Sequence, residues 1–247
     1  MNETRHKGIS FKVWGRHALF TDPLTRVGGE KCSYHLPTYE AIKGVCKSIY
    51  WKPTFIWVVD EVRAMKRIRT QTKGTKPLVY SGGNDLAIYT FLADVEYQVR
   101  AHFEWNMCRP ELESDRNAGK HFAVAQRMLE RGGRQDIFLG TRDCQGYVEP
   151  CEFGSGPGDL DGAGNLDYSL MFHGFDYPDE TGDGKLHARF WKPSLRDGVI
   201  RFPRPDECTI RKFVRDMEAK QFVKEQNLRG IGSEADELGV EACDGMD

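Results

Sequence analysis

Apolar residues recur at two different spacings along the first 150 residues, and these spacings distinguish strands from helices. Residues 95 to 105 alternate between an apolar and a polar face, which predicts a half-buried strand. Residues 8 to 20 alternate more loosely, and residues 54 to 62 are rich in β-branched and aromatic side chains, so each predicts a further strand. A fourth strand is expected around residues 136 to 141 and could extend to Val148.

Two helices are predicted between these strands. The first begins at Pro37, because proline suits a first helical turn, and it ends before Pro53. Its apolar face holds Tyr39, Ile42, Val45, Cys46 and Ile49. Asn117 is the expected N-cap of the second helix, which ends at Gly132 and Gly133.

The predicted order β-α-β-β-α-β is the split βαβ, or ferredoxin-like, arrangement. It buries both helices on one face of a four-stranded antiparallel sheet, and RNA-recognition modules share it (RRM-like). Because a fold does not define a function, this order favours nucleic-acid binding only modestly.

The remaining sequence predicts a second, smaller unit. Residues 154 to 165 are rich in glycine and are interpreted as a linker, so the first domain covers residues 1 to 150 and the second residues 151 to 229. Segments 168 to 175, 186 to 191 and 199 to 202 predict a small antiparallel sheet, and residues 209 to 228 a charged surface helix. Residues 230 to 247 are acidic and expected to be disordered. The fold class is therefore α+β, a ferredoxin-like domain followed by a small antiparallel β domain.

Composition narrows the class of protein. The seven cysteines include no C-x-x-C pair, which predicts reduced thiols and neither a disulfide framework nor a structural zinc site. No stretch approaches the ~20 apolar residues of a membrane span, and the first seven residues are polar, so we expect a cytoplasmic protein without membrane association.

The net charge of -2 conceals an uneven distribution. Residues 1 to 150 hold 23 Lys and Arg against 17 Asp and Glu, whereas residues 230 to 247 hold none against six. One run without an intervening acid contains Arg63, Lys66, Arg67, Arg69, Lys73 and Lys76. Such a run is most often a solvated face. Because this one also carries threonine and glutamine side chains that can bind phosphate and sugar, it is a candidate nucleic-acid surface.

The strongest candidate for chemistry is the start of the second helix. Lys120 and His121 lie in its first turn, where the helix dipole disfavours a cation by ~0.3 to 1 kcal/mol unless an anion joins it. A phosphate group would satisfy the lysine and the unpaired N–H groups, and the same dipole would keep the histidine neutral for proton transfer. A solvated first turn without a ligand remains the alternative.

No metal or cofactor is expected. The seven histidines never pair at i, i+4, and no carboxylate cluster is typical of a two-metal nuclease. The segment from Asp159 has some likeness to a calcium loop, but it has Leu170 where a bidentate glutamate is needed.

Six short motifs carry a resemblance to a known family. They are residues 18 to 25 (ALFTDPLT), 37 to 39 (PTY), 48 to 53 (SIYWKP), 115 to 121 (DRNAGKH), 136 to 140 (DIFLG) and 144 to 147 (CQGY). Residues 8 to 217 resemble the fifth family of CRISPR-associated (Cas) proteins, and within it the subtype I-C (Dvulg) branch, the endoribonuclease that processes CRISPR repeat RNA.

This resemblance implies a ferredoxin-like first domain and metal-independent cleavage of the repeat RNA at the 3′ base of its hairpin. It also implies that the product stays bound by its 5′ handle, with the chain a subunit of the type I-C surveillance complex. The catalytic tyrosine, lysine and histidine of the family match Tyr50, Lys120 and His121. A non-catalytic subunit that only binds the 5′ handle is the alternative, and a fold used solely for protein contacts is a third possibility.

These three side chains suit RNA cleavage by the RNA's own 2′-OH, which needs proton transfer and stabilisation of the dianion. Tyr50 presents a geometric difficulty, because ideal packing would separate the end of the first helix from the start of the second by ~20 Å. Either the first helix is shorter or tilted, or Lys120 and His121 precede the second helix, or Tyr50 only holds RNA.

Overall fold

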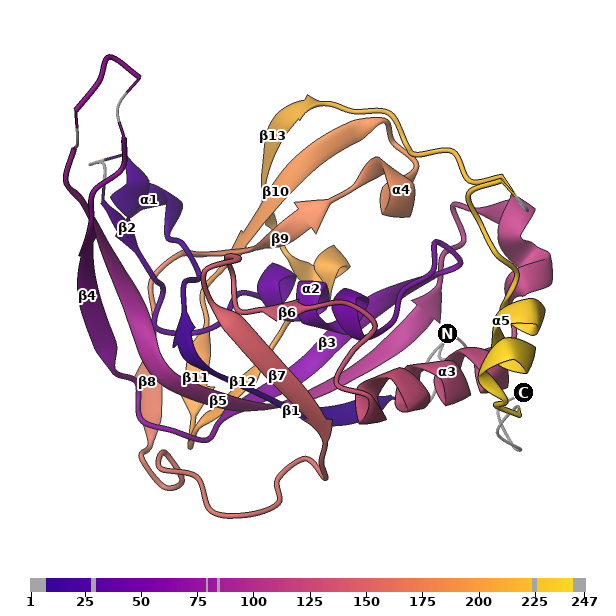
Figure 1. Cartoon of the computed structure of the whole chain (residues 1–247), viewed down its shortest axis with the longest axis horizontal. Helices are drawn as coiled ribbons and strands as arrows, with labels where there is room; N and C mark the ends of the chain where they lie inside the picture. Colours follow the sequence, from indigo (N-terminus) through magenta and orange to yellow (C-terminus); the bar gives the residue numbers. More distant parts are fainter. Residues whose placement is uncertain (1–7, 28–29, 79, 84, 224–225, 242–247) are drawn as a thin grey trace.

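The computed structural model describes residues 8–27, 30–78, 80–83, 85–223 and 226–241. The chain is a mixed α/β protein whose sheets are mostly antiparallel (Figure 1). Strands β1 (Ile9–Ala18), β3 (Phe55–Ala64), β5 (Ala87–Trp105) and β7 (Gln145–Pro150) form the centre of a ten-stranded sheet. Their spatial order is β7-β1-β5-β3, and each neighbouring pair is antiparallel. The three strands predicted at residues 8–20, 54–62 and 95–105 are thereby confirmed.

Helices α2 (Tyr39–Ile49) and α3 (Ala118–Glu130) confirm the two predicted helices. The apolar face predicted for α2 is buried, and the Asn117 side chain accepts a hydrogen bond from the Lys120 N–H as the expected N-cap of α3. The predicted start of α2 is wrong by two residues. Thr38 is its N-cap and Pro37 precedes the cap, because the threonine hydroxyl accepts the Ala41 N–H at 3.1 Å.

The fourth central strand lies later in the chain than predicted. Residues 136–141 contribute only the two-residue strand β6 (Ile137–Phe138), which pairs with β7, while β7 itself lies beside β1. The chain turns between the two because Gly140 has a φ of 95°, and a Cβ there would lie 2.1 Å from the Leu19 carbonyl oxygen. The tight turn therefore moves the pairing strand to residues 145–150.

The first half of β5 is part of a protruding hairpin that the sequence left unassigned (Figure 1). It pairs with β4 (Thr70–Thr75), and the two-residue strand β2 (Lys31–Cys32) pairs with it in parallel. The short helix α1 (Pro23–Arg26) precedes β2. Much of the basic run therefore lies on the exposed strand β4 and on the residues just before it.

The second part of the chain divides between two sheets. Strands β8 (Asn165–Asp167), β11 (Ser194–Arg196) and β12 (Val199–Arg201) continue the main sheet beyond β3. Strands β9 (Met171–Asp176), β10 (Lys185–Trp191) and β13 (Ile210–Asp216) form a separate antiparallel sheet in the order β13-β10-β9. The short helices η1 (Pro110–Asp115), α4 (Pro178–Thr181) and η2 (Pro205–Glu207) lie in connections.

Two predictions for this part are wrong. Residues 199–201 join β3 instead of the small sheet, and residues 210–216 form a strand where a helix was expected. Every residue of β13 is exposed, so no buried face revealed its period. The open edge of β10 supplies backbone partners, and this pairing outweighs the weak helix preference of a charged segment.

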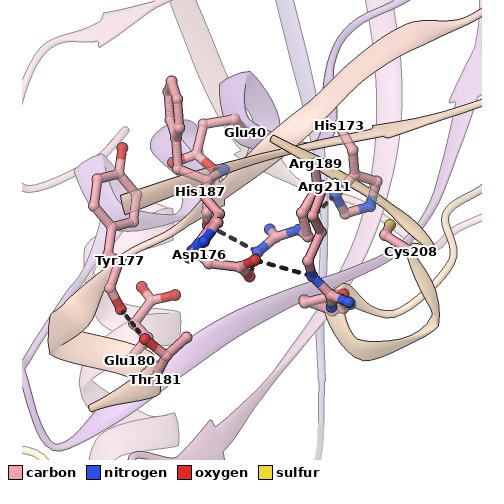
Figure 2. A network of polar contacts seen from close by, with 12 residues as sticks. Glu40, His173, Asp176, Tyr177, Glu180, Thr181, His187, Arg189, Cys208 and Arg211 are labelled. Atoms are coloured by element: carbon pink, nitrogen blue, oxygen red, sulfur yellow. Dashed lines mark hydrogen bonds and ion pairs between the residues drawn. The ribbon is translucent and has the colours of Figure 1, made fainter. Parts of the chain in front are cut away.

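Charged side chains attach the small sheet to α2, and Figure 2 shows the Asp176 contacts with Arg189 and Arg211 that join the strands of that sheet. The Glu180 carboxylate pairs with the buried Lys43 ammonium at 2.5 Å, and the Glu40 carboxylate accepts the Phe175 N–H at 3.1 Å. Within the sheet, Arg189 pairs with Asp176. These contacts fasten helix α2 to the small sheet, and the end of this helix carries Tyr50.

The expectation of disorder after residue 230 is wrong for the described part of that segment. Residues 231–238 form helix α5, which lies beside α3 (Figure 1). Ile231 and Ala235 are buried against the core, so two apolar side chains order this acidic segment when α3 offers a partner surface. Residues 242–247 lie outside the described residues.

Six cysteines in the described part of the chain are free, as predicted. Within those same ranges, no helix is long and apolar enough to cross a membrane.

Candidate active site

Tyr50 and His121 meet directly. The Tyr50 hydroxyl lies 2.9 Å from the His121 Nδ1, although the two residues come from different helices. Tyr50 follows the last turn of α2 in an extended conformation (φ -161°, ψ 136°), and its carbonyl accepts the Trp57 indole N–H at 2.7 Å. The ring therefore leaves the helix axis and reaches the first turn of α3. The separation of a helix length expected from ideal packing does not occur.

The tautomer of His121 follows from its two partners. Its Nε2 lies 2.8 Å from the Asp115 backbone carbonyl, which can only accept, so Nε2 carries the proton and donates. Nδ1 then has a free lone pair and accepts the Tyr50 O–H. The imidazole is thus neutral, with its basic nitrogen pointing at a phenol, which is an arrangement suited to proton transfer.

Burial determines the charge state of this pair. Neither side chain has exposed surface, and aromatic rings enclose the imidazole, with the Phe55 centroid 5.2 Å and the Trp105 centroid 5.7 Å away. Burial lowers the pKa of His121 to about 4 and raises the pKa of Tyr50 above its usual value. Near neutral pH the tyrosine is therefore a proton donor, and the histidine is the basic member.

Asp115 supports His121 from the end of η1. Besides the carbonyl contact, its carboxylate accepts the Thr54 hydroxyl at 2.7 Å and the Ile231 N–H at 2.5 Å, while Oδ2 lies 3.7 Å from the His121 Nε2. Asp115 belongs to the DRNAGKH motif, but its role was not predicted from the sequence. The sequence signal that could have indicated this contact is the spacing of six residues between Asp115 and His121, with the start of α3 between them.

Lys120 follows the N-cap of α3, one residue before His121, and is half-buried. Its ammonium lies 3.9 Å from the position that a Cβ on Gly232 would occupy, so it lies against the start of α5. The structure thus brings together Tyr50 and His121 by a hydrogen bond, and places Lys120 at the same end of α3.

A cleft of about 960 Å³ opens next to this pair. Phe55 and Lys52 line it on one side, and residues of the C-terminal segment line it on the other. Since the Phe55 ring lies 5.6 Å from that of Tyr50, the pair is directly behind the cleft wall. In this arrangement a ligand in the cleft does not touch Tyr50 or His121.

The basic run does not act as one surface. The Arg63 side chain is buried on β3, where it pairs with Asp161 at 2.7 Å and donates to the Gly156 carbonyl at 2.9 Å. It holds the glycine-rich segment to the sheet, so its prediction as an RNA ligand is not supported. The other members are partly or fully exposed on β4 and its flanks: Lys66, Arg67, Arg69, Lys73 and Lys76.

Potential metal ligands do not gather in the described residues, where no group of three or more His, Cys, Asp or Glu side chains could hold an ion.

The described chain thus combines a mostly antiparallel sheet, helices packed against it and a buried tyrosine–histidine pair. Comparison with known families identifies the group. The model of the CRISPR-associated protein family (Cas_Cas5) matches residues 8–203, and the chain belongs to this family. The resemblance stated from the sequence motifs is thereby confirmed.

Two curated relatives are named CRISPR pre-crRNA endoribonuclease Cas5d. The protein from Thermus thermophilus is 29% identical over 219 residues, which cover 79% of this chain and 91% of the relative. The protein from Mannheimia succiniciproducens is 26% identical over 223 residues, which cover 79% of this chain and 94% of the relative.

Two solved structures are also similar. A CRISPR-associated protein is 34% identical with a TM-score of 0.72, and the match covers 84% of this chain and 97% of that one. A functionally uncharacterized protein from Streptococcus mutans is 36% identical with a TM-score of 0.72, covering 85% of this chain and all of the other (100%).

Proposed function

We propose that this chain is an endoribonuclease that cleaves CRISPR repeat RNA at the 3′ base of its hairpin and remains bound to the 5′ handle of the product. The observation that carries the proposal is the hydrogen bond between Tyr50 and His121, because it joins two of the three residues that match the family's catalytic set. The names of the two curated relatives support the same activity. The partners are then the repeat RNA and the other subunits of a type I-C surveillance complex in the cytoplasm.

In the proposed reaction the 2′-OH attacks the adjacent phosphate, and the bond from phosphorus to the 5′ oxygen breaks. Tyr50 accepts the 2′-OH proton as its own proton passes to Nδ1 of His121, since the raised pKa of Tyr50 makes it a relay and not a base by itself. The departing 5′ oxygen takes a proton back from the same pair. Lys120 stabilises the negative charge of the pentavalent intermediate.

We also propose that the first 150 residues are a ferredoxin-like domain. The order β7-β1-β5-β3 supports this, because in chain order it reads fourth, first, third, second for the four strands that alternate with α2 and α3. This sheet would then be the platform that positions the RNA beside α3.

A specific observation favours a second candidate function, a subunit that binds the crRNA handle without cutting it. Tyr50 and His121 have no exposed surface, so in this conformation they act as core residues. One experiment distinguishes the two functions. The chain is incubated with its own repeat RNA, and we expect one cut at the 3′ base of the hairpin with a 2′,3′-cyclic phosphate upstream. Tight binding with intact RNA would establish the second function.

The exposed part of the basic run is proposed to bind the RNA backbone. Replacing Arg67 and Arg69 by glutamine is expected to weaken repeat binding at low salt, with the slope of log K against log salt falling by roughly 0.7 to 0.9 for each lost phosphate contact. Titrations of labelled, non-cleavable RNA at several salt concentrations measure this slope. Arg127 and Arg131, which are exposed at the far end of α3, are the matched control pair. An unchanged slope in the Arg67 and Arg69 variant would show that this strand faces away from RNA.

A further inference from the structure

A buried lysine and a half-exposed arginine hold one carboxylate of the C-terminal helix. Oε2 of Glu234 lies 2.6 Å from the Lys52 ammonium, and Oε1 lies 2.6 Å from Nη1 of Arg134. The carboxylate of Glu234 is 7% exposed and the Lys52 side chain 6%, so their contact is buried, whereas the Arg134 side chain is 49% exposed and reaches the carboxylate from the solvent side. Two positive groups surround one negative group, and each oxygen faces its own cation.

The positions of both cations depend on the end of α2. Lys52 follows Tyr50 by two residues, and the backbone N–H of Arg134 donates to the Ser48 and Ile49 carbonyls at 3.1 and 3.2 Å. The same helix end therefore fixes Tyr50 and the two cations relative to one another. Lys52 also raises the electrostatic potential around the pair, since its charge contributes to the low pKa of His121.

The segment that supplies Glu234 covers the candidate site. The Ile231 N–H donates to the Asp115 carboxylate, and Gly232 lies next to the Lys120 ammonium. The match to the family model ends at residue 203, so α5 lies outside the matched part of the chain. Lys52, Arg134 and Glu234 all line the 960 Å³ cleft, which leads from this contact to solvent.

We propose that Lys52 and Arg134 form a phosphate-binding subsite of the RNA cleavage site, and that Glu234 occupies it as an internal substitute until RNA displaces α5. This inference rests on the proposed function and names a part of the site that the Tyr50, Lys120 and His121 set does not include.

Chemistry favours a phosphodiester as the displacing group. A phosphodiester presents two non-bridging oxygens to the two cations, as the carboxylate does, and arginine and lysine are the usual ligands of phosphate. Removal of Glu234 without replacement would leave the buried Lys52 ammonium without its counter-ion, which is costly. The exchange of one anion for another avoids that cost and moves the cover away from Tyr50 and His121.

The direct test is the isosteric variant Glu234→Gln. Because the amide cannot compete with an anion for the two cations, the affinity for a non-cleavable repeat RNA, with a 2′-deoxy nucleotide at the cut, is expected to rise by about 5- to 50-fold. The KM for the cleavable RNA is expected to fall correspondingly, because tighter binding lowers it. Glu237→Gln is the matched control, since Glu237 lies on the same helix and its ion pair with Arg229 is exposed. Its RNA affinity should equal that of the unaltered chain.

A second variant separates binding from folding. Lys52→Met alone would leave Glu234 buried beside fewer cations, so it is combined with Glu234→Gln to remove both partners. The double variant is expected to lose the gain in affinity, by about fivefold or more relative to Glu234→Gln. If it binds as tightly as Glu234→Gln, Lys52 is no phosphate ligand and the proposal is overturned.

Hydrogen exchange of the unaltered chain supplies a test without substitution. The amides of α5 are expected to lose protection when the non-cleavable RNA binds, because RNA and α5 exclude one another. Retained protection, or an unchanged affinity of Glu234→Gln, would show that Glu234 only fastens the helix to the core. Failure of the unaltered chain to cut the ordinary repeat would instead overturn the proposed function itself, which distinguishes the two failures.

Discussion

The variant His121→Ala is expected to cleave the repeat RNA about 10²- to 10⁴-fold more slowly than the unaltered chain, the range typical of a lost general acid–base group. The substitution removes the lone pair that accepts the Tyr50 proton, so the 2′-OH proton has no destination. The affinity for non-cleavable RNA should stay within a few fold, because an interaction made in the transition state affects rate and not binding. Single-turnover cleavage and equilibrium titration measure the two quantities.

Loss of a buried ring also costs stability, so the control must be an equally buried histidine. His173 fulfils this condition: it has no exposed surface, its ring stacks on Tyr39 at 4.2 Å, and burial lowers its pKa to about 3. His173→Ala should therefore destabilise the fold to a similar degree but retain cleavage in every folded molecule. Equal loss of cleavage in both variants would indicate that His121 has only a structural role.

The parts of the fold that were predicted correctly have a periodic buried face. In α2 and in the second half of β5, each apolar position of the pattern is buried or nearly so. The side chains of a helix or strand face the core at the same spacing as the apolar residues recur in the sequence. The N-cap at Asn117 was also predicted, since a side chain that accepts a backbone N–H is a local signal that tertiary contacts need not confirm.

The parts that were predicted wrongly or left unassigned depend on distant partners. Strand β13 is exposed throughout and exists because β10 has an open edge, while the polar strand β4 forms by pairing with β5. Helix α5 buries only Ile231, Ala235 and the Glu234 carboxylate. Neither backbone pairing nor the contact of Glu234 with two distant cations produces a periodic pattern of apolar residues in the local sequence.

The candidate site was predictable only in part. Tyr50, Lys120 and His121 belong to motifs, so the resemblance indicated them. Lys52 and Arg134 are 82 residues apart and become neighbours only through the end of α2, which no local pattern records. The ideal geometry also misplaced Tyr50, since it treated the residue as part of the helix and not as the extended residue that follows it.

Removing one oxygen atom from the RNA is expected to stop cleavage entirely. The change is a 2′-deoxy nucleotide immediately 5′ of the cut, which deletes the proposed nucleophile and leaves the phosphate and hairpin contacts of the chain unchanged. The deoxy RNA should therefore bind as tightly as the ordinary repeat. A 2′-deoxy nucleotide one position 3′ of the cut is the matched control, and it should be cleaved at close to the ordinary rate.

The products of the ordinary repeat test the same mechanism independently. If the 2′-OH attacks, water takes no part in bond breaking, so the upstream product ends in a 2′,3′-cyclic phosphate and the downstream product begins with a 5′-OH. A chelator should not alter the rate, because in this mechanism the Tyr50 phenol and the His121 imidazole accept the 2′-OH proton. Cleavage of the deoxy RNA, or a 5′-phosphate on the downstream product, would require an activated water as the nucleophile. Tyr50 and His121 would then be core residues that hold α2 against α3, and the reacting groups would have to be sought in the cleft that Lys52 and Arg134 line.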